Sequence, residues 1–457
     1  MLSPDEEPML PDEFPFSPYG ASSVTPSPVS RMMASFAVDF RDGYDINLGV
    51  GYVNEQTIPR DLIRQALDAV VRDPGKYRAA FNYGSPEGSA NCIESIRRFI
   101  LREGIGGLTS EILDRNRIIV GASGATSLLE GAARVLRPGT VVTSDPLYYI
   151  YCNSLERCGY SVLAIPEDQD GIRTDILEER LESLHKPVSF FYVVTVNNPT
   201  CSILSDERRK RLLDISRRLG LATGRKIPVF FDAAYELLIH DPEAVRPCSA
   251  LLYDSEGIAF EIGTLSKLVA PGLRIGYMIG RDSPFMRAMV QRTSDAGFSA
   301  PVMNQEIAAY LLDRHASEQM RSVNAGYREK AKRTREMIAR HIGPHLEECM
   351  GGSAGFYYYL TLKRCLTEEG SPFFNYLART TGIKAVDGDG QDRNRRVVYI
   401  PGAYCVHPKG DLAEKGRRQL RISYGFEELE QVEQGIRLMG EAIEFASTGA
   451  AATARGS

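Results

Sequence analysis

The chain has 457 residues, 43% of them hydrophobic, so it can bury a large core and we expect a large and a small domain. Its formal net charge of -5 gives no basic field that would attract nucleic acid or an anionic membrane surface. The eight cysteines include no Cys-x-x-Cys pair, so no metal site or disulfide framework is predicted. The N-terminus is acidic and no apolar run reaches about 18 residues, which favours a soluble, cytoplasmic protein.

The first segment, residues 1–35, is rich in proline, serine and acidic residues. That composition is typical of a flexible arm, because it cannot build a core of its own. A second interpretation is that Phe14, Phe16 and Tyr19 fix the arm on the surface of a subunit.

Residues 36–80 are expected to form the N-terminal part of the small domain. Gly49 and Gly51 allow the backbone to approach a ligand closely, although an ordinary turn would also use them. Pro59–Val71 has the apolar spacing of a helix. Tyr83 then stands in a turn, where it either packs on the surface or contacts a ligand.

Short apolar runs alternate with amphipathic segments over the next two hundred residues or so. The predicted strands are Ile118–Val120, Val141–Thr143, Ser161–Ile165, Phe190–Val196, Val229–Phe231, Ile258–Ile262 and Ile275–Ile279, and the predicted helices include Asn91–Arg102, Leu128–Leu136 and Asp206–Leu219. This alternation predicts an α/β fold with a mostly parallel sheet covered on both faces. Ligands of such sheets bind at the carboxyl ends of the strands.

Lys267 lies among small and apolar neighbours, with Arg274 seven residues on. Burial and nearby cations lower the pKa of a lysine, so its amine becomes nucleophilic and suited to forming a Schiff base. The Thr264 and Ser266 hydroxyls and the Arg274 guanidinium are suited to holding a phosphate beside it. An aldehyde cofactor that carries a phosphate is pyridoxal phosphate.

A second phosphate element is the segment Gly121–Ser127, where small residues and hydroxyls stand between a predicted strand and a helix. The first amides of a helix have no internal partners and bind anions. The chain contains neither a P-loop nor a Gly-x-Gly-x-x-Gly fingerprint, so nucleotide binding is not supported.

Two predicted strands end in polar residues. A buried carboxylate such as Asp232 is costly unless it meets a cation, and a protonated pyridine nitrogen is such a cation. Asn198 and Tyr235 can donate hydrogen bonds to the phenolic oxygen of the same ring, and Tyr148 can stack on its face. A helix cap or a structural ion pair is the alternative interpretation of Asp232.

The order of these residues resembles that of the fold-type I pyridoxal-phosphate enzymes, the class I/II aminotransferases, from about Asp45 to Leu438. The motifs that carry the resemblance are Tyr83-x-x-x-x-Gly88, Gly124-Ala-Thr126, Asp145-Pro-Leu-Tyr148, Asn198-Pro-Thr, Asp232-x-x-Tyr235, Ser266-Lys267, Arg274 and Leu420-Arg421. The resemblance implies a large domain with a mostly parallel seven-stranded sheet, and a smaller α+β domain built from both chain ends.

By this resemblance, Lys267, Asp232 and Tyr235 are catalytic, and Arg421, Gly51 and Asn198 bind the substrate, with Arg421 on its carboxylate. The residues implied to hold pyridoxal 5'-phosphate are Lys267, Ala125, Thr126, Tyr148, Asn198, Asp232, Tyr235, Thr264, Ser266, Arg274 and Tyr83. Tyr83 corresponds to a tyrosine that reaches the phosphate of the neighbouring subunit, so a homodimer with active sites at its interface is implied.

The implied large, cofactor-binding domain spans residues 81–325 and the C-terminal small domain residues 326–448, followed by a flexible tail over 449–457. The small domain is expected to contain strands at Gly351–Leu360 and Gln419–Ser423. Two features depart from the family pattern. Cys201 stands where glycine is usual, which leaves the local turn uncertain and would place a thiol near the cofactor. The alternative is that Cys201 is only a small packed residue. The segment Asp387–Arg396 is expected to be a solvated loop.

The implied function is an aminotransferase that moves an amino group between an L-amino acid and a 2-oxo acid by a ping-pong mechanism. An alternative keeps the cofactor but catalyses elimination, gamma-replacement or C-C bond formation, possibly on S-adenosylmethionine. A non-catalytic regulatory domain is a further alternative, against which we count the lack of a basic N-terminal domain.

The side-chain specificity is less well indicated. Tyr52, Tyr149, Tyr151 and Tyr357 are candidates for a pocket that accepts aromatic or long polar substrates, although such tyrosines also pack in cores. Arg292 is a candidate partner for a distal carboxylate.

Overall fold

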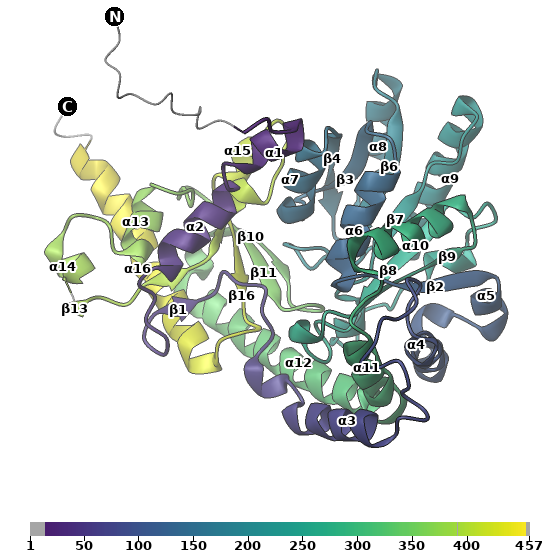
Figure 1. Cartoon of the computed structure of the whole chain (residues 1–457). Coiled ribbons are helices and arrows are strands. Elements are labelled where there is room, and N and C mark those ends of the chain that lie inside the picture. Colours follow the sequence, from purple (N-terminus) through teal and green to yellow (C-terminus); the bar gives the residue numbers. More distant parts are fainter. Residues whose placement is uncertain (1–13, 391, 454–457) are drawn as a thin grey trace, which may run out of the picture.

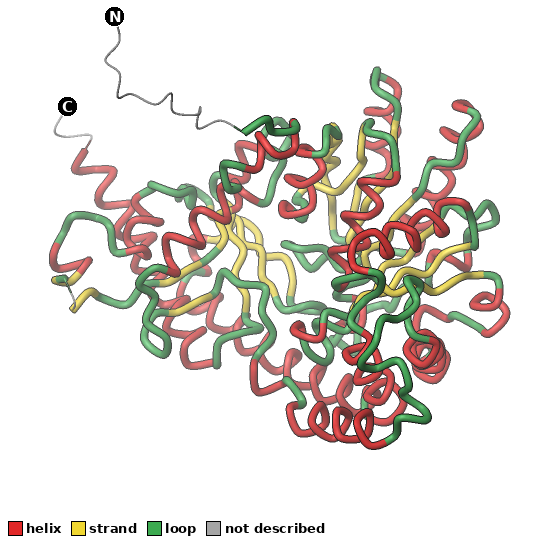
Figure 2. The backbone as a smooth tube through the Cα atoms, in the orientation of Figure 1, coloured by secondary structure: helices red, strands yellow, loops and turns green. Residues whose placement is uncertain are grey.

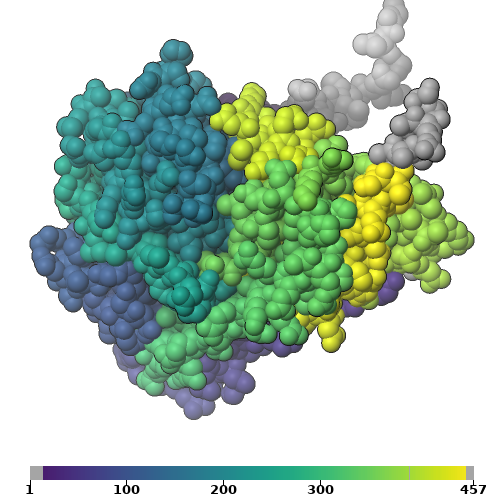
Figure 3. All heavy atoms as spheres, turned by 180° about the vertical axis from the view of Figure 1, so that it is seen from behind, coloured from purple at the N-terminus to yellow at the C-terminus, as the bar shows by residue number. Residues whose placement is uncertain are grey.

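The protein was analysed as a computed structural model, which describes residues 14–390 and 392–453. Its two main sheets have helices around them, and the second of these sheets is built from the C-terminal part of the chain (Figures 1 and 2). Seen from behind, the large and the small domain lie directly against each other (Figure 3). Within the described residues, every helix is too short or too polar to cross a membrane.

The large domain contains an eight-stranded sheet in the order β2-β9-β8-β7-β6-β3-β4-β5. Its strands are β2 (Asn116–Val120), β3 (Thr140–Asp145), β4 (Ser161–Asp168), β5 (Gly171–Ile172), β6 (Val188–Val194), β7 (Val229–Asp232), β8 (Ala259–Thr264) and β9 (Gly276–Arg281). Neighbours from β4 to β8 run parallel, whereas β9 is antiparallel to both its neighbours and β5 to β4. The predicted mostly parallel sheet is confirmed, with the two-residue edge strand β5 in addition.

The central strand β6 shows why the sheet is covered on both sides. Phe190 and Tyr192 enter the apolar core on one face, and Phe191 and Val193 enter the core on the other. All four side chains are buried, because side chains alternate between the two faces of a strand and both faces carry helices. The first of these cores includes residues of α6 and α10, and the second includes residues of α4, α9 and α11.

The helices of the large domain connect its strands or cover them. Their bounds are α4 (Ala90–Glu103), α5 (Ser110–Asp114), α6 (Gly124–Val135), α7 (Tyr149–Arg157), α8 (Thr174–Glu182), α9 (Asp206–Thr223), α10 (Pro284–Gly297) and α11 (Val302–Arg314). Helix α3 (Arg60–Arg72) packs on α11, as Figure 1 shows at the bottom of the molecule.

The small domain is built around a four-stranded antiparallel sheet in the order β10-β11-β16-β15. The strands are β10 (Leu346–Gly351), β11 (Tyr357–Leu362), β15 (Ile400–Pro401) and β16 (Gln419–Ser423), and the helices are α12 (Ala316–His341), α13 (Pro372–Ala378), α14 (Lys384–Asp387), α15 (Ala413–Gly416) and α16 (Leu429–Thr453). The strand at 419–423 is confirmed, and the strand predicted at Gly351–Leu360 is confirmed over residues 357–360 but is not continuous. A glycine-containing turn over residues 352–356 ends β10 and begins β11.

The N-terminal part of the chain joins the small domain. Strand β1 (Ile46–Asn47) pairs in parallel with β14 (Val397–Val398), and the short hairpin β12 (Gly388–Asp389) and β13 (Asp392–Arg393) lies just before β14. The two ends of the chain therefore meet in one domain, although about 350 residues separate the paired strands.

The flexible arm predicted for residues 1–35 contains helix α1 (Pro18–Ser23) and most of helix α2 (Pro28–Ala37), so the prediction is wrong for these residues. Residues 1–13 lie outside the described part of the chain. Ser17 and Ser27 cap the helices and the following prolines occupy the first helical turn, where a proline needs no hydrogen bond. Serine and proline therefore start helices here, although their abundance is typical of an unstructured segment.

Helix α2 is held by its apolar face. Val29, Met32 and Phe36 recur at helical spacing and are buried in the core of the small domain. Phe14 and Phe16 are exposed in the single chain, so their packing on a second subunit stays a prediction.

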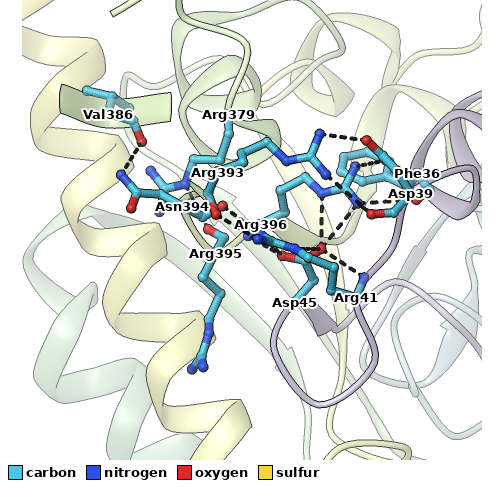
Figure 4. A network of polar contacts seen from close by, with 10 residues as sticks. All are labelled: Phe36, Asp39, Arg41, Asp45, Arg379, Val386, Arg393, Asn394, Arg395 and Arg396. Carbon is cyan, nitrogen blue, oxygen red and sulfur yellow. Dashed lines mark hydrogen bonds and ion pairs between the residues drawn. The ribbon is translucent and has the colours of Figure 1, made fainter. Parts of the chain in front are cut away.

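A network of ion pairs fixes the segment between α2 and β1 (Figure 4). The buried Asp45 carboxylate lies 2.9 Å from Arg41 Nη2 and 3.2 Å from Arg396 Nη2. Asp39 pairs with Arg393 at 2.7 Å and with Arg396 at 2.9 Å. The solvated loop predicted at Asp387–Arg396 is therefore wrong at its C-terminal end, where Arg396 is buried because it anchors the arm.

Candidate active site

A cavity of about 440 Å³ lies between the two domains, at the carboxyl ends of the parallel strands. Its large-domain side, which we call the floor, is formed by Ala125, Thr126, Leu129, Tyr148, Tyr149, Ile150, Val194, Asn198, Asp232, Ala234, Tyr235, Thr264, Ser266, Lys267, Pro271 and Arg274. Its other side, which we call the roof, is formed by Val29, Ser30, Met33, Gly49, Val50, Gly51, Tyr52, Tyr357, Ile400 and Arg421.

Lys267 follows β8 and points its amine into the cavity. Its Nζ donates a hydrogen bond to the Gly51 carbonyl at 2.8 Å, so it joins the floor to the roof. Burial, together with the positive charges of Arg421 and Arg274, lowers the pKa of Lys267 to about 8. About a tenth of the amine is thus unprotonated at pH 7, far more than for an ordinary lysine, and the unprotonated amine is the form that a nucleophile requires.

Gly51 must be a glycine for this contact. A Cβ atom at this position would lie 2.6 Å from the Tyr357 hydroxyl, closer than real side chains approach. The absence of a side chain lets the backbone carbonyl reach the lysine.

Asp232 ends β7 and is only 5% exposed. Its carboxylate accepts hydrogen bonds from the Tyr192 hydroxyl at 2.9 Å and from the Ala234 amide at 3.1 Å. Burial raises the pKa of Asp232 to about 6, although both hydrogen bonds and the Lys267 charge oppose this. A cation bound against this carboxylate, such as a protonated ring nitrogen, would relieve the cost of its burial.

Helix α6 begins directly at the cavity wall. Its N-cap residue Ser123 makes no side-chain capping bond, so the amides of Ala125 and Thr126 stand at an uncapped, positive helix end. Arg274 lies beside them, with its Nη2 donating to the Ser123 carbonyl at 3.2 Å. A Cβ at Gly276 would lie 2.1 Å from the Ala125 amide nitrogen, so this helix end packs directly on the strand that follows Arg274.

Thr264 and Ser266 complete the same corner. Their hydroxyl oxygens lie 2.9 Å apart, and the Thr264 hydroxyl also donates to the Ile275 carbonyl at 2.8 Å. A helix N-terminus, two hydroxyls and a guanidinium around one point form a cradle that fits a phosphate group.

Arg421, on β16, is 2% exposed and brings a permanent positive charge to the roof. It donates from Nη1 to Asn198 Oδ1 at 2.7 Å and from Nη2 to the Gly49 carbonyl at 2.5 Å. Its Nε has no hydrogen-bond partner within the described residues. The guanidinium also lies over the Tyr357 ring, 4.4 Å from its centroid. A buried guanidinium bound only by neutral oxygens is suited to receiving a carboxylate from a ligand.

Tyr235 and Tyr148 also line the cavity. The Tyr235 hydroxyl lies 2.9 Å from that of Tyr357, and the Lys267 amine lies 5.5 Å from the Tyr235 ring centroid. Tyr148 is half-buried and lines the cavity at the start of α7.

Twelve of the thirteen residues proposed as catalytic, cofactor-binding or substrate-binding line this one cavity, where their functional roles stay predictions. They are Gly51, Ala125, Thr126, Tyr148, Asn198, Asp232, Tyr235, Thr264, Ser266, Lys267, Arg274 and Arg421. Tyr83 is the exception: it is 76% exposed, outside the cavity, and packs on Phe298 with ring centroids 4.9 Å apart.

Two of the specificity candidates are wrong. Tyr151 lies in the core on α7 and donates to the Leu129 carbonyl at 2.8 Å, and Arg292 pairs with Glu130 at 2.9 Å on the outer side of α6 and α10. Neither lines the cavity. Tyr52, Tyr149 and Tyr357 do line it.

Cys201 keeps the turn that a glycine would make. It adopts a left-handed conformation with φ of 55°, which is unfavourable for a residue with a Cβ. Its thiol is buried beside Gly355 and does not line the cavity, and burial raises its pKa to about 12. The thiol is therefore an unreactive packing group.

Several residues that line the cavity or contact its lining residues were not predicted from the sequence. Val29 and Met33 come from α2, whose apolar spacing was hidden by its serine and proline content. Tyr192 was missed because a tyrosine inside an apolar strand looks like core packing, and only the fold shows its hydroxyl on Asp232.

Comparison with known proteins agrees with this geometry. The family model for aminotransferase class I and II matches residues 45–391. The chain is 25% identical over 391 residues to the 2-aminoadipate transaminase of Thermus thermophilus, covering 85% of this chain and 87% of that protein. It is 24% identical over 397 residues to the uncharacterized HTH-type transcriptional regulator YisV of Bacillus subtilis, covering 87% of this chain and 73% of that protein.

Among solved structures, the kynurenine aminotransferase of Pyrococcus horikoshii in complex with PMP has the same fold. The TM-score is 0.77 at 22% identity, over 93% of this chain and 96% of that chain. Because the family model covers well over half of the residues, the match is not confined to a single motif. The chain belongs to the class I and II aminotransferase family.

Proposed function

We propose that this protein is a pyridoxal-phosphate-dependent aminotransferase, which moves an amino group between an L-amino acid and a 2-oxo acid. The observation that carries the proposal is that one cavity combines the Lys267 amine, the buried Asp232 carboxylate and a phosphate cradle. When bound, the cofactor supplies an aldehyde for the amine and an electron-accepting ring for the carbanion at the α-carbon.

In this proposal the polar floor residues other than Lys267 would each have one task. The cradle of Ala125, Thr126, Thr264, Ser266 and Arg274 holds the phosphate, and Asp232 keeps the ring nitrogen protonated. Asn198 and Tyr235 donate hydrogen bonds to the phenolic oxygen, while Tyr148 packs on the ring face.

Lys267 has two tasks. With the cofactor bound, its amine would hold the aldehyde carbon, and once released, Nζ would accept the proton from the substrate α-carbon. A pKa of about 8 suits both, because the free amine is accessible near neutral pH and still basic enough to accept a proton.

Arg421 holds the substrate α-carboxylate. Two parallel N-H groups of a guanidinium bind a carboxylate in one orientation, which fixes the α-carbon relative to Lys267. The Gly49 carbonyl and Asn198 position the guanidinium from the sides that the substrate does not use.

We also propose a homodimer in which Tyr83 serves the active site of the second subunit. The proposal is supported by the exposure of Tyr83 and Phe298, which form an aromatic pair outside the chain's own cavity. Buried aromatic side chains dominate stable interfaces, whereas single exposed ones are common, so the oligomeric state must be measured.

The likeness to YisV supports one other function, that of a cofactor-binding regulatory domain without turnover. Elimination, replacement or C-C bond formation would use the same floor, and no lining residue favours one of them.

One experiment separates these functions. The purified protein is supplied with pyridoxal phosphate and treated with borohydride, and peptide mass spectrometry locates the label, with Lys267→Ala as the control. The loaded protein is then mixed with single amino acids, while the cofactor spectrum and the products are followed.

Transamination converts the cofactor to its amine form and releases a 2-oxo acid, whereas elimination releases ammonia. A loaded protein that converts no amino acid would be a regulatory domain. A protein that binds no cofactor at Lys267 would contradict every version of the proposal.

A further inference from the structure

We propose that this enzyme selects amino donors with an uncharged, hydrophobic side chain, and that helix α2 supplies the selecting wall. The inference deepens the proposed aminotransferase function and rests on it. The charged and the apolar side chains that line the cavity support it.

In the proposed function, every charged residue that lines the cavity binds the cofactor or the substrate α-carboxylate, and none binds the substrate side chain. Among the described residues that line it, four are charged: Asp232, Lys267, Arg274 and Arg421. In the proposed function, Asp232 faces the ring nitrogen, Lys267 the aldehyde carbon, Arg274 the phosphate and Arg421 the α-carboxylate. Among the described residues of one subunit, no lining cation is left for a second carboxylate.

A donor such as glutamate or aspartate would therefore bury a carboxylate without a counter-charge. Burying an unpaired charge is one of the most unfavourable events in a protein interior. Arg292, the candidate partner named from the sequence, is engaged with Glu130 away from the cavity.

The lining residues contributed by α2, α7 and β15 include four aliphatic side chains. Val29 and Met33 lie four residues apart on one face of α2, and Ile150 and Ile400 add branched aliphatic side chains from α7 and β15. Ser30, Tyr52 and Tyr149 also contribute, and their hydroxyls can donate hydrogen bonds but cannot neutralise a charge. This wall favours a hydrophobic side chain by removing its surface from water.

The wall is held from both domains. Met32 and Phe36 anchor α2 in the core of the small domain, while α1 contacts α7 of the large domain. Met33 is only half-buried and is flexible, so it can adapt to hydrophobic side chains of different shapes.

The first test uses the loaded wild-type enzyme and needs no variant. The rate of cofactor conversion per concentration of donor is measured for L-leucine, L-methionine and L-phenylalanine, and for L-glutamate and L-aspartate. We expect the hydrophobic donors to react at least about thirtyfold faster, which corresponds to about 2 kcal/mol.

The second test moves a charge into the wall. Met33→Arg places a cation where the wall is apolar, and we expect it to raise the rate with glutamate or aspartate relative to leucine by at least about tenfold. Arg31→Ala is the matched control, because Arg31 is exposed on the same helix and does not line the cavity. We expect the donor preference of this control to stay within about twofold of the wild type.

Three results would overturn the proposed donor selectivity. Acidic donors that react as fast as hydrophobic ones in the wild type would overturn the inference while leaving the aminotransferase proposal intact. An altered donor preference in Arg31→Ala would assign the selectivity to Arg31 and also overturn it. If Lys267 carries the cofactor but no donor converts it, the proposed function fails and the inference falls with it.

Discussion

The floor and the roof of the cavity are built in different ways. The floor residues follow the ends of β6, β7 and β8 or begin α6, so the backbone hydrogen bonds of a buried sheet hold them in place. The roof is formed by α2, the loop at residues 49–52, the two-residue strand β15 and single residues of β11 and β16, and side-chain contacts such as Asp45 with Arg396 hold its N-terminal part in place.

This difference separates two tasks. Reacting groups must be held within a fraction of an ångström, which rigid strand ends allow, whereas the shape of a side-chain pocket can be changed without disturbing them. Buried ionisable groups with shifted pKa values, such as Lys267 and Asp232, belong to the floor. The roof contributes mostly apolar groups, with Arg421 as its one charged lining residue within the described chain.

The largest effect is expected from the floor. Lys267→Ala should lower turnover by about a thousandfold or more, because it removes both the nucleophile and the base. Turnover with the best donor and borohydride labelling measure it. Lys330→Ala is the matched control: this lysine is also partly buried, and its Nζ donates to the Glu427 carbonyl at 2.7 Å, outside the cavity. Full turnover in Lys267→Ala would assign the chemistry to another group.

The next effect tests whether Arg421 acts with the floor although it belongs to the small domain. Arg421→Lys should lower kcat/KM by about a hundredfold, because an ammonium cannot make two parallel hydrogen bonds to a carboxylate. The loss should be the same for every amino acid, since all of them carry the α-carboxylate. A loss that depends on the donor side chain would place Arg421 in the selecting wall instead.

A third prediction concerns the anchor of the roof. Arg396→Met should lower the free energy of unfolding by about 2 kcal/mol, because Asp45 stays buried with only Arg41 beside it. Urea unfolding of the apoprotein measures this change. The double variant Asp45→Asn with Arg396→Met removes both charges and should recover part of the loss. Equal stability of Arg396→Met and the wild type would show that the network does not anchor the arm.

The smallest expected effect concerns Asp145, the last residue of β3. Asp145 is fully buried and accepts a hydrogen bond from the His407 amide at 3.2 Å, but its Oδ2 has no partner within the described residues. Burial raises the pKa of Asp145 from 3.8 to about 7.

The direction in which the unfolding free energy changes with pH follows from the difference in proton binding between the folded and the unfolded protein. The folded protein binds this proton more tightly than the unfolded chain, so stability falls as pH rises from about 4 to about 7, and the loss is complete above pH 7. Asp145→Asn removes this contribution. Between pH 6 and pH 8, its unfolding free energy should therefore fall by about 1 kcal/mol less than that of the wild type, as measured by urea unfolding at both pH values. An identical pH dependence would contradict the raised pKa.

Most of the floor could be predicted from the sequence. Asp232 and Lys267 stand directly after apolar runs, and strand ends of a parallel sheet meet at one edge, so their proximity follows from the order of elements. The positions of Tyr151 and Arg292 could not be predicted in this way. A tyrosine or an arginine on a helix has no local signal for whether it faces a cavity or a neighbouring helix.

The sequence by itself determined the alternation of strands and helices, the family, and which residues form the floor, because these depend on residues close together in the chain. Only the tertiary structure showed that α2 closes the cavity, that Arg396 reaches Asp45, and that Tyr83 lies outside. Those facts depend on contacts between segments up to about 350 residues apart, and such contacts are decided by the packing of complementary surfaces, which no local pattern records.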